Sequence, residues 1–289
     1  MIQSIGLVHE PQEPAPELVD SLSAEANVDL APELRGVPVE NVHIEPAGRI
    51  VFYTDPQGLA ADRFRFLRMR LRELWNAKKL RKLLITSPLP EDGKSTVALN
   101  LATALAERGR RTVLLLEADL HHPTLVATLG AKAGRGLIQC LESGSNPLSM
   151  LRRIEPLGWY LLPAGAQLAS PSDLLHSEAF PRLLQSLAPY FDWILIDSPP
   201  VLPLADAPAM ARHTDASLLV VRAGRTSREA VDTAMATLGP KNVLGVIVNG
   251  VEGVGRLYSK YRSYYHRPSS PAGEERTGGP DRQRSQQST

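Results

Sequence analysis

The chain has 289 residues, of which 43% are apolar and 22% charged, a composition that fits one large or two small globular domains and excludes a fibrous or wholly disordered protein. Cys140 is the only cysteine, which excludes an intramolecular disulfide and a zinc site built from several cysteines. The net charge is +1, and no segment carries the dominant basic face of a nucleic-acid-binding protein, so no nucleic acid is expected as a partner.

Residues 1–48 differ in composition from the rest of the chain. They contain six prolines, nine acidic residues and one basic residue, without a sustained apolar period. Such a segment cannot bury enough apolar surface to offset its ordering entropy, so it is predicted to be a disordered, acidic leader. The longest strongly apolar runs, such as Leu218–Val221, are far shorter than a membrane span, so no insertion into a bilayer is expected.

Residues 49–255 are predicted to form the folded domain. Apolar residues at three- and four-residue steps predict an arginine-rich helix from about Leu59 to Lys79. The predicted strands that follow are Leu83–Thr86, Thr112–Glu117, Trp159–Leu162, Trp193–Asp197, Ala216–Arg222 and Leu244–Val248. The predicted helices between them lie near Gly93–Arg108, Leu137–Ser143, Ser172–Leu187, Ala205–Arg212 and Ser227–Leu238. This alternation favours a doubly wound α/β fold, with helices on both faces of a mostly parallel sheet.

A candidate phosphate-binding loop, SPLPEDGKST, runs from Ser87 to Thr96 between a predicted strand and a predicted helix. Backbone N–H groups from Asp92 through Gly93 to Thr96 would face phosphate oxygens at the helix N-terminus. Lys94 would supply a positive charge, and the Ser95 hydroxyl could ligate Mg²⁺. Pro88 stands where the usual pattern has its first glycine, so the alternative is an ordinary loop that caps a helix.

Acidic residues end two of the predicted strands. Glu117 and Asp119 follow one apolar run, and Asp197 ends another. Because the carboxyl ends of parallel strands share one edge of the sheet, these acids are expected near the phosphate loop. Asp197 is the candidate Walker B acid for the metal, and the Glu117/Asp119 pair would supply one carboxylate for metal and one as a base.

Several segments resemble, in the same order, those of the bacterial tyrosine kinases (BY-kinases) that accompany capsule and exopolysaccharide synthesis. They are the phosphate loop, EADLHHP, IDSPPVLPLADA, LLVVRAGRTSREAV and GVIVNGV, and the resemblance covers about residues 60–265. It implies a P-loop NTPase fold related to septum-site and partition ATPases. It also implies ATP and Mg²⁺ as cofactors, metal-side roles for Asp119 and Asp197, and a place for Asn249 beside the adenine. Glu117 stands where the family usually has an aspartate, thought to help deprotonate the tyrosine.

A tyrosine cluster follows the last predicted strand. Tyr258, Tyr261, Tyr264 and Tyr265 fall within eight residues, in a tail over residues 256–289 that is predicted to be flexible. By the resemblance the cluster is an autophosphorylation site that reaches a neighbouring subunit. The alternatives are an interface segment and a base-stacking segment.

Asp62, Arg65 and Arg68 are spaced like the family's E-x-x-R-x-x-R motif, which implies a homo-oligomer such as a ring. The alternative is a solvated face of the helix. The family further implies a separate transmembrane activator of the polysaccharide co-polymerase type, and a cytoplasmic protein recruited to the inner face of the membrane.

The leading hypothesis is therefore an ATP-dependent tyrosine autokinase. In it Lys94 holds phosphates, Ser95, Asp119 and Asp197 organise the metal, and Glu117 is the base. Two other functions stay open: a partition- or septum-type ATPase, and a non-catalytic nucleotide-binding scaffold with a tyrosine-rich tail.

Overall fold

The computed structural model describes residues 31–45, 49–78, 80–166 and 170–251. Residues 1–30 of the expected leader and the whole tyrosine cluster lie outside the described residues. The strands are β1 (Val39–Asn41), β2 (Lys82–Thr86), β3 (Val113–Glu117), β4 (Arg152–Glu155), β5 (Trp159–Leu162), β6 (Trp193–Asp197), β7 (Ala216–Arg222) and β8 (Val243–Asn249). The α-helices are α2 (Val51–Thr54), α3 (Leu59–Lys78), α4 (Lys94–Ala106), α5 (Leu125–Thr128), α6 (Leu137–Ser143), α7 (Pro171–Leu175), α8 (Ala179–Leu187), α9 (Asp206–Ala211) and α10 (Arg228–Leu238).

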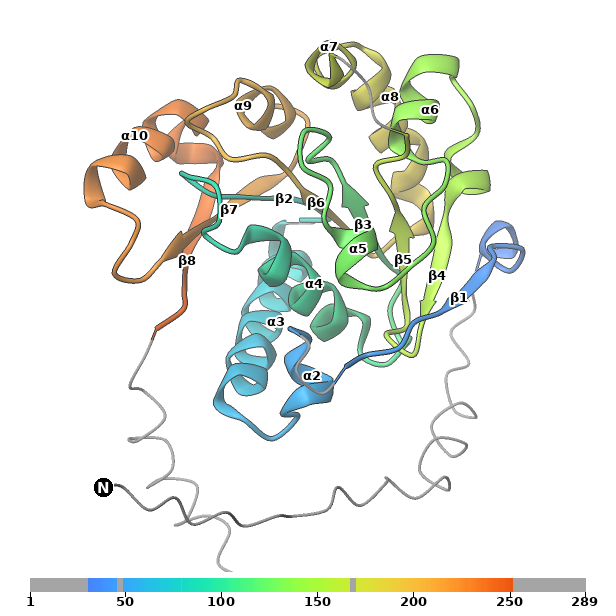
Figure 1. Cartoon of the computed structure of the whole chain (residues 1–289), viewed down its shortest axis with the longest axis horizontal. Coiled ribbons are helices and arrows are strands. Elements are labelled where there is room, and N and C mark those ends of the chain that lie inside the picture. The colour runs from blue at the N-terminus through green and yellow to red at the C-terminus, as the bar shows by residue number, and fades with distance from the viewer. Residues whose placement is uncertain (1–30, 46–48, 79, 167–169, 252–289) are drawn as a thin grey trace, which may run out of the picture. The chain divides into compact units, whose positions relative to one another are not determined.

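The strands form one eight-stranded sheet in the order β1-β4-β5-β3-β6-β2-β7-β8 (Figure 1). Every neighbouring pair is parallel except β4 and β5, which are antiparallel. The predicted mostly parallel sheet is therefore confirmed, and β1 and β4 extend it by two strands that the sequence pattern did not reveal. Strands β2, β3 and β6 lie at its centre, and the loops that follow them carry the candidate site residues.

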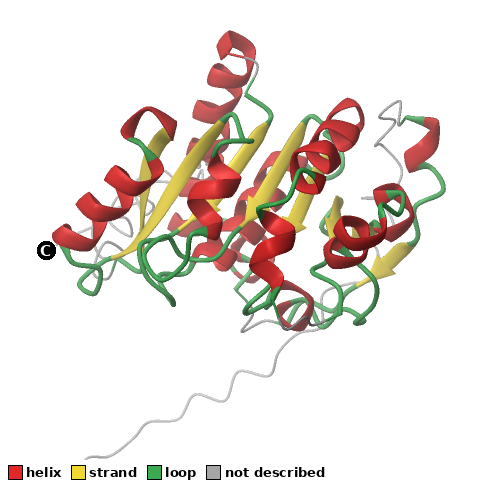
Figure 2. Ribbon diagram, turned by 90° about the horizontal axis from the view of Figure 1, so that it is seen from above, coloured by secondary structure: helices red, strands yellow, loops and turns green. Residues whose placement is uncertain are grey.

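Helices cover both faces of the sheet, as predicted (Figure 2). Consecutive residues of the central strands point to opposite faces. In β2, for example, Leu84 packs in the core beneath α6 to α10, whereas Leu83 and Ile85 pack in the core beneath α3, α4 and α5. Because both faces are buried, the central strands read as continuous apolar runs, which is why the sequence located them to within a residue or two.

One predicted helix is in fact two. The stretch expected as a single helix over Ser172–Leu187 divides into α7 and α8, with a turn between them. Pro181 lies in the first turn of α8 and has no N–H to donate to a preceding turn. A helix tolerates proline in its first turn but not in its interior, so the chain begins a new helix shortly before Pro181.

Residues 31–45, which the sequence pattern assigns to a disordered leader, have defined structure. Leu34 and Val37 are buried, with 2% and 8% of their surface exposed, and β1 pairs in parallel with β4. The ladder uses backbone groups, so it needs little apolar side chain and leaves Val39 exposed. Such a short edge strand lacks the alternation from which strands are predicted.

Candidate functional site

The loop of residues 87–93 joins β2 to α4 and is held in one conformation by Asp92. This buried carboxylate accepts the Leu89 N–H (3.2 Å) on one oxygen and the Thr226 hydroxyl (2.7 Å) on the other. Gly93 has φ +95°, a left-handed conformation that favours glycine, and a side chain there would collide with the amide of Asn249. These contacts fix the backbone conformation of the loop where it enters the first turn of α4.

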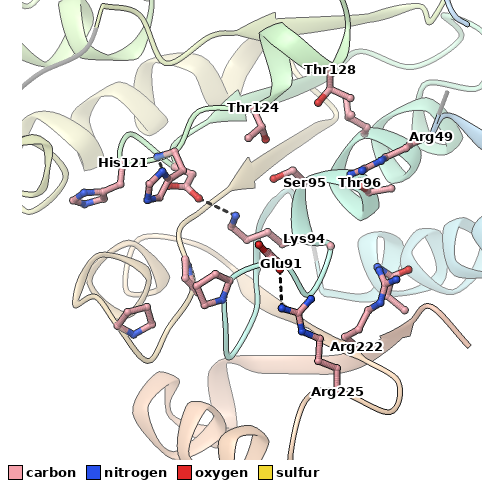
Figure 3. A pocket seen from close by; sticks show the side chains of 18 of the residues that line it. Arg49, Glu91, Lys94, Ser95, Thr96, His121, Thr124, Thr128, Arg222 and Arg225 are labelled. Carbon is pink, nitrogen blue, oxygen red and sulfur yellow. Dashed lines mark hydrogen bonds and ion pairs between the residues drawn. The ribbon is translucent and has the colours of Figure 1, made fainter.

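The first residue of α4 meets the end of β3. Lys94 Nζ lies 2.8 Å from Oδ2 of Asp119, and the other oxygen of Asp119 accepts the backbone N–H of His122 at 3.1 Å. The two side chains are only 13% and 3% exposed. Lys94 and Asp119, which are 25 residues apart in sequence, thus form a largely buried ion pair at the carboxyl edge of the sheet (Figure 3).

Asp197, at the end of β6, is the most perturbed acid of the group. Burial raises the pKa of its carboxyl to about 7, although the charge of Lys94 and a hydrogen bond from Ser95 act to lower it. The charges of Asp119 and Glu117 raise this pKa further. Its Oδ1 is buried without a hydrogen-bond partner among the described residues. A buried carboxylate oxygen that lacks a donor is suited to a cation or to a water bound by one.

Glu117, the last residue of β3, is buried and bonded to two backbone amides. Its Oε1 accepts the N–H of Leu125 at 2.6 Å, at the start of α5, and its Oε2 accepts the N–H of Ala164 at 3.0 Å. The residue is 1% exposed. Both carboxylate oxygens thus accept backbone donors, and these contacts join the start of α5 to the loop after β5. The base role of Glu117 stays a prediction.

A cavity of about 1120 Å³ opens over the first turn of α4. Among the sequence-predicted residues, Gly93, Lys94, Ser95, Thr96, Asp119 and Asn249 line it. Asp92, Glu117 and Asp197 lie behind this lining and are each 1% exposed. The cavity also exposes residues that the sequence reasoning did not assign: Arg49, Thr124, Thr128, Arg222 and Arg225 (Figure 3). In the sequence, the only feature that could have indicated these residues is the positive charge of the three arginines.

The residues around the cavity fit a magnesium-bound nucleotide. The first N–H groups of a helix have no acceptor within that helix, so the start of α4 is suited to an anion. Ser95 is hydrogen-bonded to the carboxylate of Asp197, and Oδ1 of that carboxylate has no hydrogen-bond partner among the described residues. Among the described ranges, no group of three His, Cys, Asp or Glu side chains has the arrangement of a metal site. The nucleotide's own phosphates would thus complete the coordination of an ion held by Ser95 and the acids.

Next to the cavity, a buried carboxylate links two histidines. Oδ2 of Asp206 lies 2.8 Å from Nε2 of His121, and Oδ1 lies 3.0 Å from Nε2 of His176. Ser172 donates its hydroxyl to the same carboxylate at 3.1 Å. His121 and His122 line the cavity, so this network fixes the loop after β3 against α7 and α9.

The proposed interface residues lie on α3, at a distance from the cavity lining. Arg65 pairs with Asp62 at 2.7 Å within the same helix, and Arg68 donates to the carbonyl of Ala104 at 3.3 Å. Both arginines line a second, smaller hollow of about 520 Å³, together with the exposed Phe66 and Met69. Among the described residues, no helix is both long and apolar enough to cross a bilayer.

The chain is similar to several known proteins. A family model described as "AAA domain" matches residues 92–239. Tyrosine-protein kinase YwqD of Bacillus subtilis (strain 168) is 30% identical over 217 residues, which cover 74% of this chain and 89% of that protein. The succinoglycan biosynthesis transport protein ExoP of Rhizobium meliloti (strain 1021) is 29% identical, and the match covers 73% of this chain but only 29% of ExoP.

One of the solved structures with a similar fold is also a tyrosine-kinase domain. The kinase domain of the Escherichia coli tyrosine kinase ETK superposes with a TM-score of 0.67 at 27% identity, covering 71% of this chain and 80% of that one. The match supports the P-loop NTPase fold that the sequence predicted. Together with the phosphate loop over α4 and the acids that end β3 and β6, these likenesses show that the chain belongs to the bacterial tyrosine-kinase (BY-kinase) family.

Proposed function

We propose that this chain is an ATP-dependent protein tyrosine kinase that phosphorylates the tyrosine cluster of its own C-terminal tail in another copy of the chain. The observation that carries the proposal is the cavity over α4, where Lys94 and Asp119 meet beside Ser95 and the buried Asp197. Phosphoryl transfer needs mainly positioning and charge stabilisation, and this group of residues offers both.

The roles follow from the contacts. The backbone from Gly93 to Thr96 and the ammonium of Lys94 would bind the phosphates, and Asn249 would lie by the adenine. Ser95, Asp119 and Asp197 would hold Mg²⁺, which when bound supplies positive charge to the phosphate oxygens. Asp119 is the one of the three strand-end acids that lines the cavity, so it is the acid positioned to meet an incoming tyrosine hydroxyl.

Asp92 and Glu117 support this arrangement without facing the cavity. Asp92 fixes the phosphate loop through Leu89 and Thr226. Glu117 joins the start of α5 to the loop after β5.

The acceptor tyrosines of the proposal are Tyr258, Tyr261, Tyr264 and Tyr265, which lie outside the described residues. Each phosphate would add roughly −1.5 to −2 charges to a tail that holds seven basic and three acidic residues. Phosphorylation of all four would make the tail strongly negative. We expect this change to weaken association between subunits, because an uncharged tail could occupy a neighbour's cavity and a phosphorylated one would be repelled.

The setting of the reaction is part of the proposal. The name of ExoP connects one relative to polysaccharide biosynthesis and transport. The chain is proposed to act in such a pathway, as a homo-oligomer held by the Asp62, Arg65 and Arg68 face of α3. A separate transmembrane activator of the co-polymerase type would recruit it from the cytoplasm to the inner face of the membrane.

One experiment tests the activity against its alternatives. Purified protein is incubated with ATP and Mg²⁺, with and without a candidate activator, and probed for phosphotyrosine. Wild type should become labelled, whereas Lys94→Met and the variant with all four tail tyrosines changed to phenylalanine should not. ATP hydrolysis without phosphotyrosine would indicate a septum- or partition-type ATPase, and nucleotide binding without either product would indicate a scaffold.

A further inference from the structure

An N-terminal segment that precedes the phosphate loop reaches the nucleotide cavity. After β1 at the edge of the sheet, the chain continues to Arg49 and α2, and the side chain of Arg49 lines the cavity with Thr96 and Leu99 of α4. Figure 3 shows Arg49 beside Thr96, with Arg222 and Arg225 elsewhere along the cavity. A residue from outside the phosphate loop thus contributes to the wall of the site.

Arg49 is held there by a buried side chain of α4. Asn100 is 1% exposed, and its Oδ1 accepts the N–H of Val51 at 2.8 Å. Its Nδ2 donates to the carbonyl of Arg49 at 2.7 Å and to the carbonyl of Thr96 at 2.9 Å. The amide of one side chain therefore fixes the backbone on both sides of residue 50 to the first turn of the phosphate-loop helix.

Two further contacts anchor the same segment. Ile50 is 4% exposed and packs into the core beneath α3 and α4. The hydroxyl of Tyr53 donates a hydrogen bond to the carbonyl of Pro156. The core contacts of Ile50 and the hydrogen bonds of Asn100 and Tyr53 fix the backbone here, so the Arg49 side chain extends from a defined position at the cavity wall.

The charges around the cavity indicate what Arg49 would bind. The lining contains the cations Lys94, Arg49, Arg222 and Arg225, and the acids Glu91 and Asp119. Asp119 pairs with Lys94, and Glu91 pairs with Arg225 at 2.7 Å. Within the described part of the chain, the guanidinium groups of Arg49 and Arg222 have no carboxylate within salt-bridge distance. Two cations without acidic partners, facing a cavity at a helix N-terminus, favour a polyanion.

We propose that Arg49 binds a phosphate group of the nucleotide and that Asn100 is the residue that positions it. Arg49 is then part of the nucleotide site, and the residues that follow it anchor it there. This inference rests on the proposed function, because it assumes that ATP occupies the cavity. Arg49 provides a planar, permanently charged group that can donate two hydrogen bonds to one phosphate, which a lysine cannot match.

The test measures the affinity of the full-length protein for Mg²⁺·ATP and for inorganic tripolyphosphate by calorimetry. Arg49→Met should weaken both ligands by about the same factor, roughly tenfold for one partly exposed charge-assisted contact. Arg63→Met, at an exposed arginine of α3 that does not line the cavity, is the matched control and should bind as wild type does. Unchanged ATP affinity in Arg49→Met would overturn the inference, and so would a loss for ATP without a loss for tripolyphosphate.

Asn100 is tested by a double-mutant cycle. Asn100→Ala should weaken ATP binding when Arg49 is present and should have no further effect in Arg49→Met, because the two residues act through one contact. Equal effects in both backgrounds would assign Asn100 a merely structural role. Lys94→Met separates the two hypotheses: if wild type binds ATP, Lys94→Met does not and Arg49→Met binds normally, the Arg49 inference fails and the proposed function stands. If wild type binds no ATP, the proposed function itself fails.

Discussion

Lys94 Nζ, at the first residue of α4, lies 2.8 Å from Oδ2 of Asp119, two residues beyond the end of β3. The two groups neutralise each other at the wall of the cavity, where Lys94 is also the cation expected to bind phosphate. The position of Lys94 thus depends on an acid that the proposed chemistry assigns to Mg²⁺. The ammonium and the metal would share the Asp119 carboxylate, so a change at Asp119 should affect both.

Asp119→Asn is expected to separate these two effects. The amide cannot neutralise Lys94, so ATP affinity measured without Mg²⁺ should be higher than that of wild type. With Mg²⁺, the gain in affinity that the metal gives wild type should shrink, because a neutral oxygen is a weaker ligand for a hard cation. Calorimetric titrations with ATP in magnesium and in EDTA measure both quantities. Asp173→Asn, at an exposed acid of α7, is the control, and a variant with the full wild-type magnesium effect would contradict the metal role of Asp119.

Asp197 predicts a specific dependence of stability on pH. Burial raises the pKa of its carboxyl to about 7 in the folded chain, whereas an unfolded aspartate has a pKa of about 3.9. Between these values the folded state binds the additional proton, so this contribution to stability is complete below about pH 4 and is lost as the pH rises through 7. Asp197→Asn removes the titration. The free energy of unfolding of the variant should exceed that of wild type by roughly 2–4 kcal/mol at pH 8, with a smaller excess at pH 5.

Urea denaturation of both proteins at pH 5 and pH 8, without nucleotide or metal, measures this difference. The comparison subtracts the other titrating groups, which the two proteins share. A constant difference between wild type and Asp197→Asn over this range would show that the carboxyl of Asp197 does not have a raised pKa.

Glu117 is predicted to stabilise the fold rather than to take up a proton. In Glu117→Gln one oxygen becomes an NH₂ group, which cannot accept an N–H, so either Leu125 or Ala164 loses its acceptor. A buried donor left without an acceptor costs about 1–3 kcal/mol, which should appear as a lower free energy of unfolding. Glu117→Asp should also be destabilised, because a side chain shorter by one methylene cannot reach both amides.

The alternative role of Glu117 predicts the opposite pattern. If Glu117 is a base, Glu117→Gln should keep its stability and lose about 10²- to 10⁴-fold in the rate of phosphotyrosine formation. Glu117→Asp should then recover most of that rate. Denaturation curves and initial rates on the same preparations distinguish the two roles.

The sequence predicted the centre of this molecule better than its margins. Buried parallel strands are continuous apolar runs, which located β2. The sequence Gly-Lys-Ser-Thr directly after such a strand is typical of a phosphate loop that leads into a helix, which located the loop and α4. The meeting of Lys94 and Asp119 followed from the rule that parallel strands end at one edge. At the edge of the sheet, by contrast, β1 forms through backbone bonds to a partner more than a hundred residues away.

Two features of the site that no sequence pattern indicates, the position of Arg49 and the partners of Glu117, have the same physical origin. Arg49 enters the cavity because Asn100 fixes the backbone around it, and no local pattern reports a contact between residues 51 apart. Glu117 has the position in its strand that a base would have, but the amides that occupy its oxygens come from two loops 8 and 47 residues further along the chain. Sequence spacing identified which groups reach the sheet edge, whereas their partners depend on tertiary contacts.

The face of α3 provides the last prediction, on assembly. Arg65 and Arg68 border a hollow in which Phe66 is 56% exposed and Met69 is 48% exposed, so apolar surface lies beside two cations. If this face joins subunits, Arg65→Glu with Arg68→Glu should shift the protein from oligomer to monomer in light scattering after gel filtration, because like charges would oppose a partner's acids.

Binding of ATP should stay at the wild-type level in this double variant, since neither arginine lines the nucleotide cavity. Arg63→Glu is the matched control, because Arg63 is an exposed arginine of the same helix that does not line the hollow. Phosphotyrosine formation in trans should fall in the double variant and should recover as the protein concentration is raised. Unchanged molar mass in the double variant, or an equal loss of assembly in Arg63→Glu, would remove this face of α3 from the interface.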